Sequence, residues 1–234
     1  MPMWSIGGVA DRFLDLALPA ACAGCGREGP PLCETCRPSL DARIDVSAGV
    51  PIGLPSETPP PLLQLEWCAP FVGTVRRALH QLKYSGERRL ARPLGQAVAR
   101  RWAVAGAGGD LLVPVPVHPD RARRRGYDQA VLIAMVAAEE LHLPAAPILR
   151  RARATAAQFD LDRTSRASNV DGAFELVARP DGHASGSVGA PLAGRWVVLV
   201  DDVVTTGATL SACARPLLAA GAMGVSAVTV ARER

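Results

Sequence analysis

Short apolar runs along the chain predict the strands of a buried, mostly parallel sheet. Residues 196–200 are all apolar and mostly β-branched, as expected of a strand that is covered on both faces. In the apolar run 111–117, Pro114 and Pro116 cannot donate ladder hydrogen bonds, so this strand should end near Val113 or Pro114. Further strands are predicted at 67–72, 172–177 and 225–230.

Longer stretches show the three-to-four-residue apolar spacing of amphipathic helices. This spacing covers residues 75–82, 90–104 and 131–141, and it resumes at Leu210 and runs to Leu218. A shorter amphipathic helix is predicted near the N-terminus, on Ile6, Val9, Phe13, Leu16 and Ala17. The strands and helices together predict an α/β fold, a mostly parallel sheet flanked by helices.

Changes in composition divide the chain into three predicted parts. Residues 1–46 hold the N-terminal helix and four of the six cysteines, and residues 47–64 are rich in Pro, Gly and Ser, as in a linker. Residues 65–234 hold the predicted strands and long helices and should form the α/β domain. A chain of 234 residues can bury one good core and carry a small appendage.

The N-terminal cysteines form two C-x-x-C knuckles separated by a short loop. Their thiolates can converge tetrahedrally on zinc, so a structural zinc site is predicted at Cys22, Cys25, Cys33 and Cys36. Disulfides and a redox C-x-x-C pair are the alternatives, and both are disfavoured, the first by the expected compartment and the second because the motif is doubled. Cys68 and Cys213 stand alone and are predicted to be small buried apolar residues.

Charge and hydropathy exclude few functional classes but set the expected compartment. The formal net charge is +4 and the pI about 8.9, which permits anionic ligands without requiring nucleic acid. No window is long and apolar enough to span a bilayer, and Asp11, Arg12 and Asp15 interrupt the apolar N-terminus. A cytoplasmic protein is therefore expected.

The segment after the strand 196–200 carries the main candidate chemistry. Two adjacent carboxylates, Asp201 and Asp202, need a neighbour such as a sugar diol or a metal ion to offset their repulsion. Small residues and hydroxyls before a predicted helix suit a phosphate, because backbone N–H groups and the helix dipole favour an anion there. The phosphate-binding candidates are Thr205, Thr206, Gly207, Ala208 and Thr209. A solvated acidic turn is the alternative, whereas a nucleotide hydrolase would need a Walker A loop that the chain lacks.

Basic residues near other predicted strand ends could meet the same anion. The segment 121–126 is a basic loop in this interpretation, because it lies between a strand end and a helix start, and arginine forks match phosphate oxygens. The candidate pyrophosphate ligands are Lys83, Arg123, Arg124 and Arg125. A solvated basic turn is the alternative for the arginines, and chance is the alternative for Lys83, the only lysine in the chain. The polar segment 150–169 is typical of a loop that closes over a ligand or of an ordinary surface loop.

The stretch 198–209 resembles the phosphoribosyl pyrophosphate signature of type I phosphoribosyltransferases. Its sequence is Val-Leu-Val-Asp-Asp-Val-Val-Thr-Thr-Gly-Ala-Thr. The resemblance implies that Asp201 and Asp202 hold the ribose 2- and 3-hydroxyls and that Thr205 to Thr209 surround the 5-phosphate. It also implies magnesium, bound together with the pyrophosphate group.

Further motifs are similar to those of the ComF family and recur in the same order. They comprise the two knuckles, Leu82-Lys-Tyr-Ser-Gly86, Val113-Pro-Val-Pro116, Arg125-Gly-Tyr-Asp-Gln129, Arg153, Thr155, Gln158, Arg166, Asn169 and Gly172-Ala-Phe174. That resemblance implies an N-terminal zinc finger joined to a phosphoribosyltransferase-like domain, with a link to DNA uptake in natural competence. Competence-machinery proteins are partners that the resemblance implies.

Two functions are consistent with these residues. An enzyme would transfer ribose 5-phosphate from phosphoribosyl pyrophosphate to an acceptor, with the protein supplying position and charge stabilisation. A binding protein would sense a phosphorylated ligand in the same pocket and hold single-stranded DNA on the zinc module and the segment 121–125. Aromatic residues make up only 4% of the chain, so the sequence favours the phosphoribose site over a DNA groove.

Overall fold

The computed structural model describes residues 21–48, 58–151, 172–177 and 192–233. The predicted helix near the N-terminus lies outside these residues, as does most of the polar segment 150–169. Among the described residues, no helix has both the length and the apolar character needed to cross a membrane.

A four-stranded parallel sheet forms the centre of the protein. Its strands are β1 (Leu65–Pro70), β6 (Gly224–Arg232), β5 (Trp196–Val204) and β2 (Leu111–Pro114), in that spatial order. Every neighbouring pair is parallel, so all four carboxyl ends lie at one edge of the sheet. This confirms the predicted sheet, and β2 ends at the proline where the sequence places its end.

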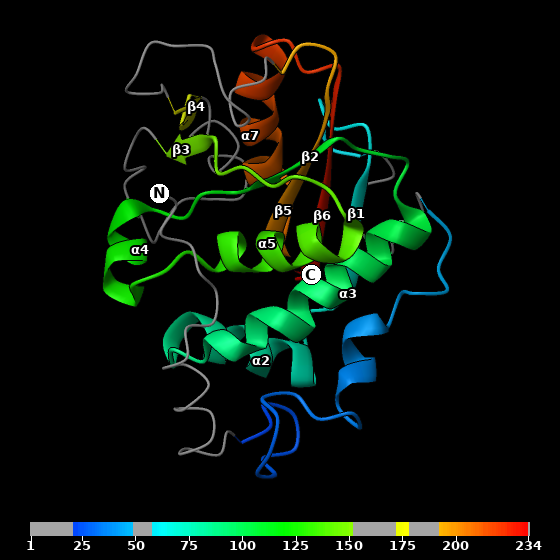
Figure 1. The fold of residues 1–234 in the computed structure, drawn as a ribbon, viewed down its shortest axis with the longest axis vertical. Helices are drawn as coiled ribbons and strands as arrows, with labels where there is room; N and C mark the ends of the chain where they lie inside the picture. Colours follow the sequence, from blue (N-terminus) through cyan, green and yellow to red (C-terminus); the bar gives the residue numbers. More distant parts are fainter. Residues whose placement is uncertain (1–20, 49–57, 152–171, 178–191, 234) are drawn as a thin grey trace.

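Helices cover both faces of the sheet (Figure 1). One face is covered by α2 (Gly73–Tyr84), α3 (Ala91–Ala105) and α5 (Gln129–Leu141), and the other by α7 (Ala208–Ala219). Each helix presents an apolar face to the sheet and therefore belongs to one of two buried clusters. The predicted α/β fold with flanking helices is confirmed.

Strand β5 distributes its side chains between these two clusters. Val198 and Val200 pack with α3 and α5, whereas Val197 and Leu199 pack with α7, because neighbouring residues of a strand point to opposite faces. The strand also extends beyond the predicted end at Val200. It pairs with β6 as far as Val204, so both aspartates lie within the strand rather than after it.

The basic segment is a helix, which corrects the predicted loop. Helix α4 spans Pro119–Arg125 and begins with proline in its first turn. Proline fits there because a backbone N–H in the first turn would have no acceptor within the helix. The His118 side chain caps the helix by accepting from the Asp120 backbone N–H, and Gly126 ends it in the left-handed conformation. The helix is short, and its Arg121, Arg123 and Arg124 are exposed, whereas Arg125 is half-buried.

Two further short strands lie apart from the main sheet. Strand β4 (Phe174–Leu176) matches the strand predicted at 172–177, and it pairs antiparallel with β3 (Leu149–Arg151), which no pattern predicted. In the described ranges, the remaining elements are two 3-10 helices, η1 (Arg37–Asp41) and η2 (Arg88–Leu90).

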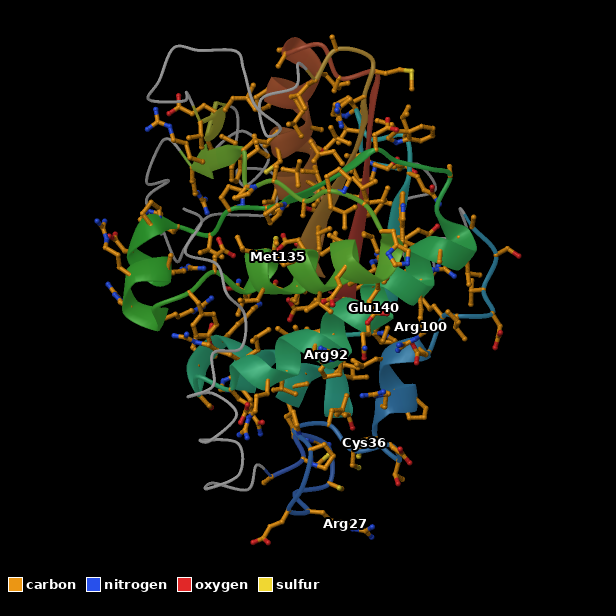
Figure 2. The ribbon with its side chains drawn as sticks, viewed as in Figure 1. Arg27, Cys36, Arg92, Arg100, Met135 and Glu140 are labelled. Carbon is orange, nitrogen blue, oxygen red and sulfur yellow. The ribbon has the colours of Figure 1, made fainter. Side chains whose placement is uncertain are left out.

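The cysteine module, residues 21–46, packs against α2 and α3 (Figure 1). Its Leu32 and Leu40 are buried in the same cluster as the helices. On α3, Arg100 (labelled in Figure 2) forms a bidentate ion pair with Asp41. The neighbouring Arg101 donates to the carbonyls of Arg43 and Val46. The module and the sheet domain thus share one core, although the three-part division of the chain remains a prediction.

The connections between strands diverge at the carboxyl ends of β5 and β2. The chain leaves β2 through α5 on one face and continues to Ala145, which bridges β2 on its outer side. It leaves β5 through α7 on the other face and returns to β6 on the opposite side. In open α/β sheets, ligands bind outside the carboxyl ends of the strands where the connections diverge in this way.

Candidate functional site

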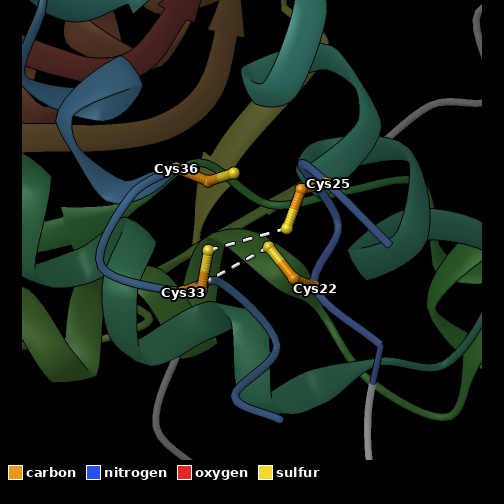
Figure 3. A group of neighbouring side chains, drawn as sticks. All are labelled: Cys22, Cys25, Cys33 and Cys36. Carbon is orange, nitrogen blue, oxygen red and sulfur yellow. Dashed lines mark hydrogen bonds between the residues drawn. The ribbon is translucent and has the colours of Figure 1, made fainter. Parts of the chain in front are cut away.

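The four knuckle cysteines converge at one point in the cysteine module (Figure 3). Their sulfur atoms all lie within 4.8 Å of one another, and the Sγ atoms of Cys25 and Cys33 are 3.7 Å apart. Tetrahedral zinc with bonds of ~2.3 Å would separate its sulfur ligands by ~3.8 Å. The four cysteines could therefore hold a zinc ion, and they are the only group of three or more candidate ligands in the described part of the chain.

Backbone groups around Cys22 favour its thiolate form. Burial opposes ionisation, but N–H groups including those of Cys33 and Gly24 donate to the sulfur and lower the pKa of Cys22 to about 6. Gly24 also has a steric role, because a Cβ there would lie 2.4 Å from the Cys36 sulfur. The first knuckle can thus approach the second closely only with glycine at this position.

Three elements bring polar side chains together around Asp202 at the end of β5. The Asp202 residue is 5% exposed, and its Oδ2 lies 2.9 Å from the Lys83 ammonium of α2. The same oxygen accepts a 2.9 Å hydrogen bond from the Gln129 amide at the start of α5. The structure therefore places Lys83, a predicted pyrophosphate ligand, directly against a predicted ribose ligand.

Asp201 lies on the other side of the strand. Its Oδ1 accepts from the Asp202 backbone N–H at 2.8 Å, and it raises the pKa of the Cys213 thiol on α7, where burial has the larger effect. Burial and the neighbouring charge of Asp202 raise the pKa of the Asp201 carboxyl well above its usual value. A ligand that contacts both aspartates must therefore sit across the end of β5.

The predicted phosphate loop connects β5 to the start of α7. Thr205 and Thr206 are exposed, and Thr209 lies in the first turn of α7, where a helix leaves backbone N–H groups without partners. Gly207 has a φ of 82°, and a Cβ there would lie 2.6 Å from Cγ of Pro59. The glycine is thus required by the backbone conformation and by Pro59, in addition to any role with a ligand.

The predicted pyrophosphate arginines differ in their environments. Arg123 is exposed and pairs with Asp120 in its own helix, and Arg124 is also exposed. Arg125 points toward α2 and α5, where it donates to Gln129 at 2.6 Å and lies over the Tyr84 ring at 5.2 Å. Only Arg125 of the three connects through hydrogen bonds to the Asp202 cluster.

The residues after Arg125 support the site in ways that the sequence did not show. Asp128 caps α5, accepting from the backbone of Ala130 and Val131, and also accepts from Val117 beyond β2. The Tyr127 hydroxyl donates to the Leu82 carbonyl on α2. An aspartate directly before the apolar helical pattern is a capping signal that could have identified the role of Asp128 at α5. The contacts of Asp128 with Val117 and of Tyr127 with Leu82 join segments that are distant in sequence.

The exposed face of α2 carries a second group of polar residues. Tyr84 is 66% exposed and its ring centroid lies 4.7 Å from that of His80. A cavity of about 340 Å³ lies on this helix, away from Asp202, and its lining residues are Gly73, Arg76, Arg77, His80 and Gln81. None of the described residues that line the cavity carries a carboxylate, and Arg77 also donates to the carbonyls of Ala23 and Gly24 in the first knuckle.

Solved structures offer a distant likeness, and no family model matches the chain. The glutamine phosphoribosylpyrophosphate amidotransferase from B. subtilis, complexed with ADP and GMP, is 19% identical with a TM-score of 0.41. The likeness covers 65% of this chain but only 30% of the amidotransferase chain.

Curated relatives match much more of the sequence. The DNA utilization protein YhgH of Escherichia coli K12 is 32% identical over 213 residues, which cover 88% of this chain and 86% of that protein. The protein of the same name from Salmonella typhi is 29% identical over 83% of this chain and 87% of its own. Competence protein F of Haemophilus influenzae is 32% identical over 124 residues, and the match spans about half of each chain, 53% and 50%. With its cysteine cluster and parallel sheet in place, this chain belongs to the ComF family, the family of YhgH and competence protein F.

Proposed function

We propose that this ComF-family protein binds phosphoribosyl pyrophosphate with magnesium beyond the carboxyl ends of β5 and β2, and transfers its ribose 5-phosphate group to an acceptor. The observation that carries the proposal is the cluster of Asp202, Lys83 and Gln129 next to a loop that opens a helix. An ammonium, a carboxylate and a helix N-terminus at one site offer matched partners for pyrophosphate, ribose hydroxyls and phosphate.

Each part of the ligand has a candidate partner. The 5-phosphate would accept from backbone N–H groups and hydroxyls of Thr205 to Thr209, and the ribose diol would donate to Asp201 and Asp202. The pyrophosphate would draw Lys83 away from Asp202 and would contact Arg125, with exposed Arg123 and Arg124 within the same helix. Exchange of partners by Lys83 would then leave Asp202 free to accept from a ribose hydroxyl.

In the reaction, an acceptor nucleophile would attack C1 of the ribose as the bond to pyrophosphate breaks. The electron pair of that bond leaves with the pyrophosphate, whose negative charge Lys83 and Arg125 would stabilise. Positive charge that develops at the sugar ring would be stabilised by the aspartates at the end of β5. The protein thus contributes mainly position and electrostatics.

Magnesium would reach this site with the ligand. Outside the cysteines, no group of three candidate metal ligands occurs among the residues that the structure describes. Magnesium binds through one or two carboxylates together with substrate phosphates in many phosphoryl sites, and Asp201 and Asp202 fit that limited role. The ion would neutralise charge on the pyrophosphate.

Calorimetric titration with phosphoribosyl pyrophosphate and magnesium tests the proposal. Asp202→Asn removes the charge and keeps the shape, so affinity should fall by about tenfold or more, as expected for a lost charged hydrogen bond. Asp45→Asn, at an exposed position of the cysteine module, is the matched control and should bind as the wild type does. Equal affinity in the wild type and Asp202→Asn would place the ligand elsewhere, and no binding by the wild type would reject the proposal.

A second candidate function is binding of single-stranded DNA, which the exposed face of α2 favours. Arg76, His80 and Tyr84 follow one another at helical spacing beside the cysteine module, and basic side chains with exposed rings suit phosphates and bases. The arginines of α4, which lie within Arg121 to Arg125, extend this surface, because Arg125 lies over the Tyr84 ring. The names of the relatives, DNA utilization protein and competence protein F, support this role and a link to the competence machinery.

Titration of a labelled oligonucleotide across salt concentrations tests this second candidate. Arg76→Ala and Tyr84→Ala should each weaken binding, and Arg76→Ala should also reduce the salt dependence, because fewer counterions are released. Arg92→Ala is the control, since Arg92 is an exposed arginine of α3 (Figure 2). Equal binding by all three variants would argue against the α2 surface.

A cytoplasmic location is part of the same proposal. Its support is the arrangement of the knuckle thiols, which suits a metal rather than disulfides, and cysteines remain reduced in the cytosol.

A further inference from the structure

Gln129 is a buried polar residue at the centre of the candidate site. It is the first residue of α5 and only 4% of its surface is exposed. A buried side-chain amide requires partners for both of its ends, because an unsatisfied group costs free energy. Gln129 has such partners, and both carry charge.

These partners fix the direction in which the amide points. Arg125 Nη1 donates to Oε1 of Gln129 at 2.6 Å, and Nε2 of Gln129 donates to Oδ2 of Asp202 at 2.9 Å. A guanidinium can only donate and a carboxylate can only accept. Reversing the amide would therefore place its NH2 group against the donor of Arg125 and its oxygen against the acceptor of Asp202.

The amide also connects two groups that the proposed ligand would contact. Asp202 accepts from Lys83 and from Gln129 through the same oxygen. If Lys83 moves to the pyrophosphate, Gln129 remains as the donor that holds the carboxylate. Its other end meanwhile holds Arg125 close to the site.

We infer that Gln129 is a positioning residue, which orients the Asp202 carboxylate for the ribose hydroxyls and couples it to Arg125. This inference rests on the proposed function for its ligand. Its structural part, the orientation of Asp202, is independent of that function. A role in packing alone is the alternative, because Gln129 also begins a buried helix.

Substitution by glutamate separates these roles. Gln129→Glu keeps the shape and still accepts from Arg125, but it opposes a carboxylate to Asp202. Asp201, Asp128, Lys83 and Arg125 are the other charged groups around this position. Burial and repulsion by the carboxylates favour the protonated form of the introduced carboxyl and act against the attraction of Arg125 and Lys83, so that it regains a proton, and a donor, as pH falls.

Affinity for phosphoribosyl pyrophosphate with magnesium is measured for the wild type, Gln129→Glu and Gln129→Met at about pH 8 and about pH 5.5, a range that spans a raised carboxyl pKa. Both variants should bind about tenfold or more weakly at the higher pH, the size expected for a lost hydrogen bond to a charged group. The deficit of Gln129→Glu relative to the wild type should shrink at the lower pH, whereas that of Gln129→Met should not. Packing alone predicts no such difference.

Gln96→Glu is the matched control. Gln96 of α3 also donates at 2.9 Å to a carboxylate, that of Glu140 (labelled in Figure 2), but this hydrogen bond is exposed. The affinity of Gln96→Glu for phosphoribosyl pyrophosphate should equal that of the wild type at both values of pH. Wild-type affinity in both Gln129 variants would overturn the inference, and so would a Gln129→Glu deficit that is independent of pH.

A crystal structure of Gln129→Met keeps the inference testable if the wild type fails to bind the ligand. That failure would reject the proposed function, and the orientation of Asp202 would then decide the inference. A carboxylate turned away from its present position supports a positioning role. An Asp202 side chain that stays in place against Lys83 overturns it.

Discussion

Replacing Arg101 by methionine should destabilise the protein more than the same change at its neighbour, Arg100. Arg101 is 1% exposed and forms a buried ion pair with Glu66 of β1, which is fully buried. Its other nitrogen donates to the carbonyls of Arg43 and Val46, both at 2.6 Å. One side chain thus joins α3, the sheet and the end of the cysteine module.

The expected loss in the free energy of unfolding is about 4 kcal/mol. Removing one partner of a buried ion pair costs roughly 3–5 kcal/mol, because the carboxylate of Glu66 stays buried and is left with the longer 3.7 Å contact with Arg43 and the hydrogen bond from Gln64. Two carbonyls each lose a hydrogen bond of about 1 kcal/mol. Burying the apolar methionine side chain returns about 2 kcal/mol.

Urea unfolding at neutral pH measures the difference, with Arg100→Met as the control. Arg100 pairs with Asp41 with good geometry, but its side chain is 39% exposed, so its loss should cost about 1 kcal/mol or less. If Arg100→Met and Arg101→Met lose the same stability, burial does not determine the strength of these pairs and the reasoning is wrong.

Three further predictions concern the two sites. Purified wild-type protein should contain about one zinc per chain by elemental mass spectrometry, and Cys33→Ser should contain far less; a zinc-free wild type under reducing conditions would contradict the metal site. The pKa of Asp201 is raised in the folded state, so the folded protein holds the proton of this carboxyl more tightly than the unfolded chain does. The free energy of unfolding therefore falls as pH rises above about 4. Asp201→Asn should therefore stabilise the protein at pH 8 and not at pH 4 in thermal unfolding, and equal shifts at both would refute this. Gly207→Ala should lose about 2 kcal/mol of stability, because the backbone at this position is left-handed and the added Cβ would contact Pro59. In contrast, Thr209→Val should weaken ligand binding with little effect on unfolding in urea.

The sequence predicted those elements whose causes are local. The apolar run at 196–200 and the prolines after Val113 located strands β5 and β2, because burial on both faces and missing N–H donors act within a few residues. The spacing of the cysteines likewise predicted a cluster that the structure confirms. Helix α4 was missed although Pro119 and Gly126 are ordinary start and stop signals, because the density of arginines was interpreted as a loop.

Pairings between distant segments could not be predicted in this way. Strand β5 continues to Val204 because β6 supplies its hydrogen bonds, and neither strand shows this alone. Lys83 and Asp202 are 119 positions apart in the sequence, and their contact depends on how α2 packs over the sheet. Gln129 ends a motif that resembles the ComF family, but the motif does not show the partners of its side chain, so only the fold shows that its neighbours are charged. The assignments of ribose, phosphate and pyrophosphate contacts remain predictions.

Helix α2 has fixed contacts near both of its ends, which makes its length as important as its composition. Arg77 is held by the carbonyls of the first knuckle, and Lys83, six residues later, reaches Asp202. Each residue of an α-helix advances the chain by ~1.5 Å and turns it by about 100°. Deleting or inserting one residue between Arg77 and Lys83 would therefore swing the ammonium away from β5, or pull the helix off the knuckle. Substitutions on the exposed side of this stretch can be accommodated, but a change in its number of residues cannot.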